Sequence, residues 1–421
     1  MRTIYTALYL LLACVPVAQA ETYEPSTSVV SEPADTLSLQ EAMDLALNAN
    51  AEIAIALRER EAVEGMQMQA AARPNPVASA RMEDTRSSTR ETTLEVSQPL
   101  ELGNKRAMRM EAADRFYDAA SAGVALKKAE IQADVTAAFY GVLAAQERLR
   151  LAESSLEVAQ RASDAASKRV QAGKISPVEE TRSRIAESSV RLELNQAKSA
   201  LNITRKQLTA LWGNALPSFS QADGRVDSIE TVPVLGELIQ RLDQAPALQR
   251  ARLEVDTRSA LVDVEKTRAT PDVSITVGAK RNEELGLNQA VLGLSVPIPL
   301  FNRNQGNIQE AMSRADKARA EVAALRIQLE TALARAYERL ETARQAATSY
   351  QDDILPGAQS AFDAAAKGFE FGKFSFLEVL DAQRTLVQAK SQYLNALLQA
   401  HEATADIKRI LGDAISTQDG Y

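Results

Sequence analysis

The chain has 421 residues, of which 5% are aromatic and 25% are charged, and its formal net charge is −8. Long stretches rich in Ala, Leu, Glu, Gln, Arg and Lys are typical of long packed helices. The negative charge, without a basic cluster interleaved with aromatic residues, argues against a nucleic-acid-binding protein. The single cysteine excludes a disulfide bond within the chain.

The start of the chain, 1–20, has the features of a secretory signal peptide. An apolar run over 4–13 follows Arg2, a short charged n-region, and 18–20 offers a small-x-small cleavage site. In an alternative interpretation, Cys14 closes a lipoprotein box and becomes a lipidated N-terminus. The leucine two residues before that cysteine fits such a box poorly, which favours cleavage after residue 20. The apolar run is too short to span a membrane as a helix.

Residues 21–36 are polar and predict a flexible leader. The apolar spacing over 37–72 then predicts a helix that ends before Pro74. Its counterpart in the second half is 235–270, which we expect to be interrupted at Pro246.

Each of these helices is followed by a predicted β-hairpin, 77–99 and 273–299. The predicted strands are 77–84, 92–99, 273–280 and 290–296. Apolar and polar residues alternate along them, which indicates a sheet with two unlike faces. Strands of ~9–11 residues with this alternation are typical of transmembrane barrels. Four strands cannot close a barrel and open edges are not tolerated in lipid, so the pattern predicts assembly with further copies.

After each hairpin comes a long predicted helix, 104–171 and 302–371. Each is about 68 residues, or ~100 Å at ~1.5 Å per residue. Pro356 should kink or break the second one. A shorter helix follows each, 176–212 and 375–411, so each half should be a long rod beside two half-rods.

Small residues and caps add detail to these helices. Small side chains that let long helices approach closely are Ala119, Ala120, Ala122, Gly123, Ala318, Ala320, Ala323 and Ala324. Both shorter helices open with a Ser-x-x-Glu capping box, Ser176 with Glu179 and Ser375 with Glu378.

The two halves repeat each other at an offset of 198–199 residues. The aligned pairs are Pro99 with Pro297, Asn104 with Asn302, Gly173 with Gly372 and Ser176 with Ser375. We therefore expect a first repeat over 37–213, a linker over 214–234, a second repeat over 235–412 and a tail over 413–421.

Together, the signal peptide, the repeated halves, one alternating hairpin per half and the Gly-Lys turns resemble the TolC-like outer-membrane factors. The segment LSVPIPLFNRNQGNIQEA (294–311) is most similar to the heavy-metal branch, the outer-membrane subunits of cobalt–zinc–cadmium type efflux. The resemblance covers essentially all of 37–412. It implies a mainly α-helical fold with a small β part.

The resemblance implies a homotrimer in the outer membrane of a Gram-negative bacterium. Each chain would give four strands to a shared twelve-stranded transmembrane β-barrel, above a long α-helical barrel that forms a periplasmic tunnel. The partners implied are outer-membrane lipid, a periplasmic adaptor and an inner-membrane pump of the resistance–nodulation–division class. The expected function is a passive conduit for divalent heavy-metal cations, without a cofactor, a resident metal or catalysis.

Two groups of site residues follow from the resemblance. The adaptor-docking tip comprises Val170, Gly173, Lys174, Ser176, Gly372, Lys373 and Ser375. The lumen constriction comprises Glu378, Asp381 and Phe369. Acidic rings favour cations, although Glu378 is also the expected cap residue. Arg182 stands in the first repeat where the second has Asp381, so a salt link between them is conceivable.

Competing interpretations remain open at the sequence level. His401 continues an apolar heptad seam, which favours a packing role over metal ligation. No phosphate loop, HExxH motif or nucleophile elbow is present, so the sequence gives no support to an enzyme. The same channel architecture could export drugs or a type I secreted polypeptide. A soluble periplasmic coiled-coil adaptor or scaffold is the alternative from another class.

Overall fold

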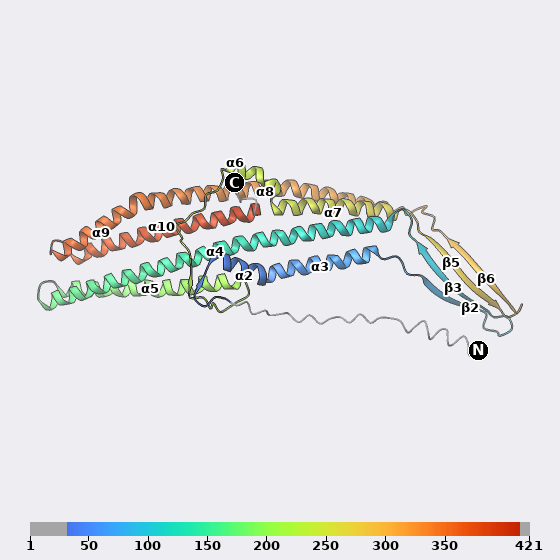
Figure 1. The fold of residues 1–421 in the computed structure, drawn as a ribbon, viewed down its shortest axis with the longest axis horizontal. Helices are drawn as coiled ribbons and strands as arrows, with labels where there is room; N and C mark the ends of the chain where they lie inside the picture. The colour runs from blue at the N-terminus through green and yellow to red at the C-terminus, as the bar shows by residue number, and fades with distance from the viewer. Residues whose placement is uncertain (1–31, 413–421) are drawn as a thin grey trace. The chain divides into compact units, whose positions relative to one another are not determined.

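The computed structural model describes residues 32–412 (Figure 1). The expected signal peptide with Cys14, residues 21–31 of the expected leader and the expected tail 413–421 lie outside this part. No helix between residues 32 and 412 combines the length and the hydropathy that crossing a membrane requires.

The elements follow the repeat. In the first half they are α2 (Leu39–Ala49), α3 (Ala51–Ala71), β2 (Val77–Glu83), β3 (Glu91–Leu100), α4 (Lys105–Gln171) and α5 (Pro177–Ala210). In the second half they are α6 (Leu235–Arg241), a 3-10 turn (Leu242–Gln244), α7 (Pro246–Arg268), β5 (Val273–Asn282), β6 (Leu287–Ser295), α8 (Gln305–Ser349), a π-helical turn (Tyr350–Ile354), α9 (Leu355–Glu370) and α10 (Phe376–Leu411). Two short strands, β1 (Thr36–Leu37) and β4 (Gln221–Ala222), pair in parallel.

The long helices lie beside shorter ones, as expected. Helix α4 packs against α3 and α5 and also against α7 and α10, while α8 packs against α7 and α10 (Figure 1). Residues at three- and four-residue spacing on α4, among them Val135, Phe139 and Val142, are buried in the largest apolar cluster. Burying one such side chain stabilises the fold by about 1.5–3 kcal/mol.

The expected single helix over 37–72 is wrong, because the chain breaks at Asn50. This residue has an extended backbone (φ −68°, ψ 128°), and its side-chain oxygen accepts the N–H groups of Glu52 (2.8 Å) and Ile53 (3.1 Å). Its amide also donates to the carbonyl of Leu211 (2.7 Å). Asn50 therefore caps α3 and ties it to the end of α5, a long-range contact that apolar spacing does not reveal.

Both expected proline interruptions are confirmed. Pro246 is the first residue of α7, after a 3-10 turn. Pro356 lies in the first turn of α9, directly after the π-helical turn. A proline lacks the N–H that an α-helix interior needs, and the first turn is where that loss is tolerated.

One of the two expected capping boxes is confirmed. Ser375 and Glu378 cap α10 reciprocally. At α5 the prediction is wrong, since the Ser176 side chain accepts the N–H of Val178 (3.3 Å) and forms no reciprocal box. The carboxylate of Glu179 turns instead to Arg182, one helical turn on (3.5 Å).

Four strands form one antiparallel sheet in the order β2-β3-β5-β6. Rows of apolar residues on one face are Ala80, Leu94, Ala279 and Ala290, then Ala78, Val96, Val277 and Leu292. Residues of the opposite face include Ser79, Arg81, Glu95, Ser97, Thr276 and Lys280. The apolar face is open, with Leu292 82% exposed. The strands of the second hairpin extend further toward its loop than predicted, because their pairing continues through the polar residues Arg281 and Asn282.

At the start of the long helices, the structure aligns the two repeats differently from the sequence. Asn104 and Asn304, not Asn302, precede the long helices and share a left-handed backbone (φ 62° and 61°). Pro99 and Pro297 stand 198 residues apart, whereas these asparagines stand 200 apart. Counted from the aligned prolines, the second long helix therefore begins two residues later than the first.

The part of the expected leader that the structure describes, 32–36, is held by the segment 212–222. The carboxylate of Glu32 accepts the indole N–H of Trp212 (2.7 Å) and the backbone N–H of Ser218 (2.8 Å). Both partners lie more than 170 residues further along the chain. These hydrogen bonds fix the entry of the chain into α2.

Candidate functional site

The two turns at the end of the helices have the same backbone. Gly173 and Gly372 have φ of +64° and +71°, a left-handed conformation that favours glycine. The N–H of Lys174 donates to the carbonyl of Arg169 (2.9 Å), and the N–H of Lys373 donates to that of Gly368 (2.7 Å). This is the hydrogen bond of a Schellman motif, which satisfies carbonyls at a helix end.

The predicted docking residues lie together on these turns. Gly173, Lys174, Ser176, Gly372, Lys373 and Ser375 are exposed, and Val170 is half-buried. A Cβ atom on either glycine would meet no atom within 4 Å. Only the backbone conformation, and not crowding, therefore restricts these two positions.

Arg169 joins the two turns, a contact that sequence reasoning missed. Its guanidinium donates to the carbonyl of Phe369 (3.1 Å) and lies 4.0 Å from the centre of that ring. The Phe374 ring covers Gly368 so closely that a Cβ there would lie 2.1 Å from it. Phe369 and Phe374 thus pack within the tip. Arg169 and Phe369 are 200 residues apart in sequence, so local patterns do not reveal their contact.

The acidic residues of the expected constriction have different environments. Glu378 accepts the backbone N–H of Ser375 (2.5 Å) in the cap of α10. Asp381 is exposed and lines a cavity of about 350 Å³ between α4, α5 and α10, together with Glu193 and Arg384. Within this chain, Arg182 pairs with Glu179 on its own helix. It does not form the salt link to Asp381 that the sequence made conceivable.

His401 is buried in helix packing, as its heptad position predicts. Its imidazole stacks on Tyr140, with ring centres 3.5 Å apart, and its Nε2 lies 2.7 Å from the carbonyl of Val226. Burial lowers its pKa, although this hydrogen bond acts in the opposite direction. Among residues 32–412, no group of three or more His, Cys, Asp or Glu side chains is placed to hold a metal ion.

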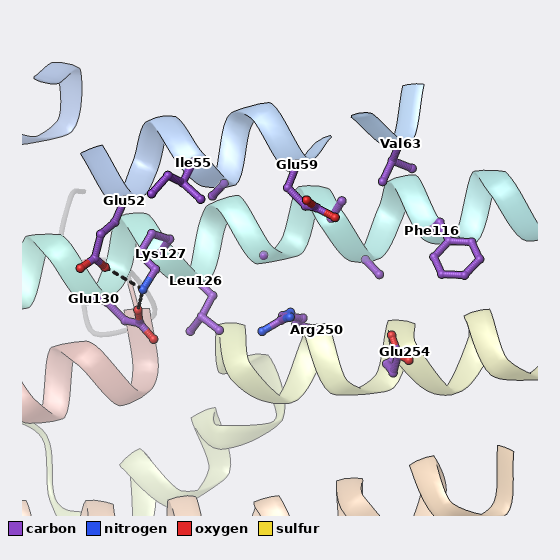
Figure 2. Close-up of a pocket in the computed structure, with 14 residues that line it drawn as sticks. Glu52, Ile55, Glu59, Val63, Phe116, Leu126, Lys127, Glu130, Arg250 and Glu254 are labelled. Carbon is purple, nitrogen blue, oxygen red and sulfur yellow. Dashed lines mark hydrogen bonds and ion pairs between the residues drawn. The ribbon is translucent and has the colours of Figure 1, made fainter. Parts of the chain in front are cut away.

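The small residues of α4 lie where α4 packs against α3 and α7. Ala119, Ala120 and Gly123 line a cavity of about 560 Å³ between these three helices (Figure 2). At one end of it, Lys127 bridges the carboxylates of Glu52 (3.0 Å) and Glu130 (2.7 Å). Composition alone does not reveal whether a small residue faces a neighbouring helix or a gap.

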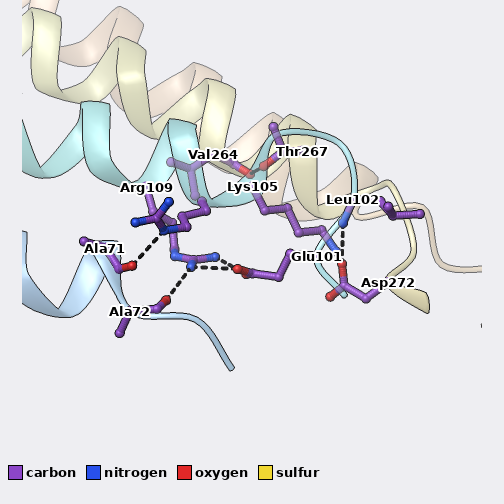
Figure 3. Close-up of polar contacts among 10 residues, drawn as sticks. Ala71, Ala72, Glu101, Leu102, Lys105, Arg109, Val264, Thr267 and Asp272 are labelled. Carbon is purple, nitrogen blue, oxygen red and sulfur yellow. Dashed lines mark hydrogen bonds and ion pairs between the residues drawn. The ribbon is translucent and has the colours of Figure 1, made fainter. Parts of the chain in front are cut away.

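A polar cluster fixes the junction between β3 and α4 (Figure 3). Asp272 accepts the N–H of Leu102 (3.2 Å) and the ammonium of Lys105 (2.6 Å). Arg109 pairs with Glu101 and also donates to the carbonyl of Ala72 (3.3 Å), at the end of α3. The first junction is therefore tied both to α3 and to the segment that precedes β5.

The fold matches those of outer-membrane channels. The open-state MtrE outer membrane channel of Neisseria gonorrhoeae superposes with a TM-score of 0.74 over 95% of this chain and 97% of that one, at 20% identity. The chain matches the family "Outer membrane efflux protein" over residues 42–214 and 238–413. It belongs to this family.

Relatives with metal-resistance names are among the similar proteins. The cobalt-zinc-cadmium resistance protein CzcC of Cupriavidus metallidurans is 44% identical over 98% of this chain and 100% of its own length. The nickel-cobalt-cadmium resistance protein NccC of Alcaligenes xylosoxydans xylosoxydans is 29% identical over 58% of this chain and 55% of its own. The resemblance to the heavy-metal branch of this family is thereby confirmed.

Proposed function

We propose that three copies of the chain form one outer-membrane channel, with the sheets joined into a twelve-stranded barrel and the helices into a periplasmic tunnel. The sheet is the observation that carries this proposal. It has two unpaired edges, β2 and β6, and one apolar and one polar face. Exposed strand edges pair with other chains, and barrels in lipid place the apolar face outward.

The tip is the proposed contact with a periplasmic adaptor, which connects the channel to an inner-membrane pump of the resistance–nodulation–division class. Two turns of equal backbone geometry lie close together there and present exposed Lys174 and Lys373. A partner with paired helical ends and acidic groups fits such a surface, because exposed cations steer oppositely charged partners.

The proposed cargo is divalent heavy-metal cations, which pass without catalysis. Full-length similarity to CzcC at 44% identity supports this class of cargo. Three copies of Asp381, with Glu378 beside it, would form an acidic constriction. Replacing Asp381 with Asn should then lower cation preference in planar bilayers, and an unchanged reversal potential would count against the constriction.

Growth on metals tests the cargo directly. A deletion strain without a redundant channel is plated on zinc, cobalt, cadmium, copper and a panel of drugs, and is complemented with the chain. We expect sensitivity to zinc, cobalt or cadmium that the intact gene reverses. Unchanged metal tolerance with new drug sensitivity would assign the channel to drug export instead.

A further inference from the structure

The two junctions between a strand and a long helix differ in their surroundings. The first is held by the cluster around Asp272 (Figure 3). The second, 296–303, is longer and carries four exposed apolar side chains: Val296 at 45%, Ile298 at 76%, Leu300 at 66% and Phe301 at 92%. Contiguous exposed apolar side chains on a folded protein mark a surface that something covers.

The sequence around the second junction favours lipid as its cover. The chain has no charged residue from Leu285 to Asn302, so the apolar face of β6 continues directly into the junction. Arg303 ends this run, and it is exposed, with its guanidinium 3.4 Å from the carbonyl of Pro299. Apolar side chains followed at once by a cation are typical of segments at a membrane surface, where the cation meets headgroup phosphate.

A neighbouring copy of the chain is a poorer cover. Pro297 and Pro299 have no N–H group, so the junction cannot extend the hydrogen-bonded ladder of β6 to another strand. The opposite edge of the sheet has the same limit, because Pro74 and Pro76 precede β2. Strand pairing between copies would therefore stop where the junction begins.

We propose that 296–303 is a membrane-surface anchor that fixes the depth of the channel in the bilayer. Ile298, Leu300 and Phe301 enter the boundary between acyl chains and headgroups, and Arg303 contacts lipid phosphate. The anchor belongs to the second junction alone, since polar contacts hold the first against the helices. This inference rests on the proposed insertion of the sheet into a membrane.

Tryptophan fluorescence tests the anchor in the full chain. Phe301→Trp is reconstituted into phosphatidylethanolamine–phosphatidylglycerol vesicles with brominated acyl chains, which quench nearby indoles. The parent chain supplies the baseline, because its single tryptophan, Trp212, is only 4% exposed. Leu292→Trp reports on the apolar face of the sheet, and Leu102→Trp is the matched probe at the first junction.

We expect Phe301→Trp to add a blue-shifted emission that is quenched, most strongly by bromines close to the headgroups. Leu292→Trp should be quenched most by bromines deep in the chains, and Leu102→Trp should lose less emission than Phe301→Trp. An unquenched probe at 301 beside a quenched one at 292 overturns the anchor. In that case, a blue-shifted emission would mean that a neighbouring copy of the chain covers 296–303. A red-shifted emission would mean that 296–303 is exposed to water. Should the probe at 292 also escape quenching, the sheet is not in lipid and the proposed function itself fails.

Discussion

The two long rods reach the same tip by different routes. Helix α4 runs unbroken for 67 residues from Lys105 to Gln171. Its counterpart is divided into α8, a π-helical turn and α9, with Pro356 just after the division. Yet both end in the same glycine turn. The repeats thus share the turn whose backbone geometry only glycine adopts easily. They differ along the long helices, where both a continuous and a divided helix can be packed.

Exchanging the proline between the rods should have the largest effect. Glu157→Pro places a proline in the interior of α4 near the position equivalent to Pro356, which should cost about 3 kcal/mol or more. Pro356→Ala should change stability little, because Pro356 already lies in a tolerant first turn. Thermal loss of helical circular dichroism measures both, with Glu157→Ala as the control. A Glu157→Pro protein that melts like its parent would show that α4 is no more continuous than its counterpart.

Filling the glycine turns should come next in size. Valine at Gly173 or Gly372 must adopt a positive φ, at about 1–2 kcal/mol per site. We expect the double valine variant to remain assembled but to lose metal resistance, since the turns would no longer fit the adaptor. Gly357→Val, on an open helical surface, is the control. Normal resistance of the double variant would mean that the shared turn is only a helix cap.

The contact between the two turns of the tip, Arg169 with Phe369, should matter less to stability. Arg169→Ala removes the interaction of the guanidinium with the Phe369 ring, which is worth about 0.5–1 kcal/mol at exposed sites. If this contact holds the two tips together, the variant should open more often in planar-bilayer recordings. Lys168→Ala, its exposed neighbour, should behave like the parent. Equal opening in both variants would remove Arg169 from the closing contacts.

The smallest effect is expected from pH at Glu32, which holds the end of the first repeat. Burial alone would raise the pKa of this carboxylate, but hydrogen bonds from Ser218, Trp212 and Asn214 together lower the pKa below its ordinary value. A lowered folded-state pKa contributes stability that is present above the unfolded value and is lost as pH falls through the folded value. Melting temperatures of the parent and Glu32→Gln should therefore converge in acid. A constant difference between them would contradict the shift.

Periodicity and proline positions were sufficient to predict most elements, because both depend on neighbours in sequence. The alternation in β5 and the interruption at Pro246 are examples. The break at Asn50 was missed because its partner Leu211 lies 161 residues away. The same reason hides the contact of Arg169 with Phe369 at the tip. The backbone conformation of the two glycine turns was predictable from the sequence. The roles of the residues on these turns depend on other proteins that would bind there.

Glu32 also has a consequence for how the chain folds. Its hydrogen-bond partners Trp212 and Ser218 stand 180 and 186 residues further on. Closing so large a loop carries an entropic cost that local helices do not have, so we expect the first hairpin, β2–β3, to form before the entry segment is secured. The beginning of the described chain should therefore be among the last parts to become ordered.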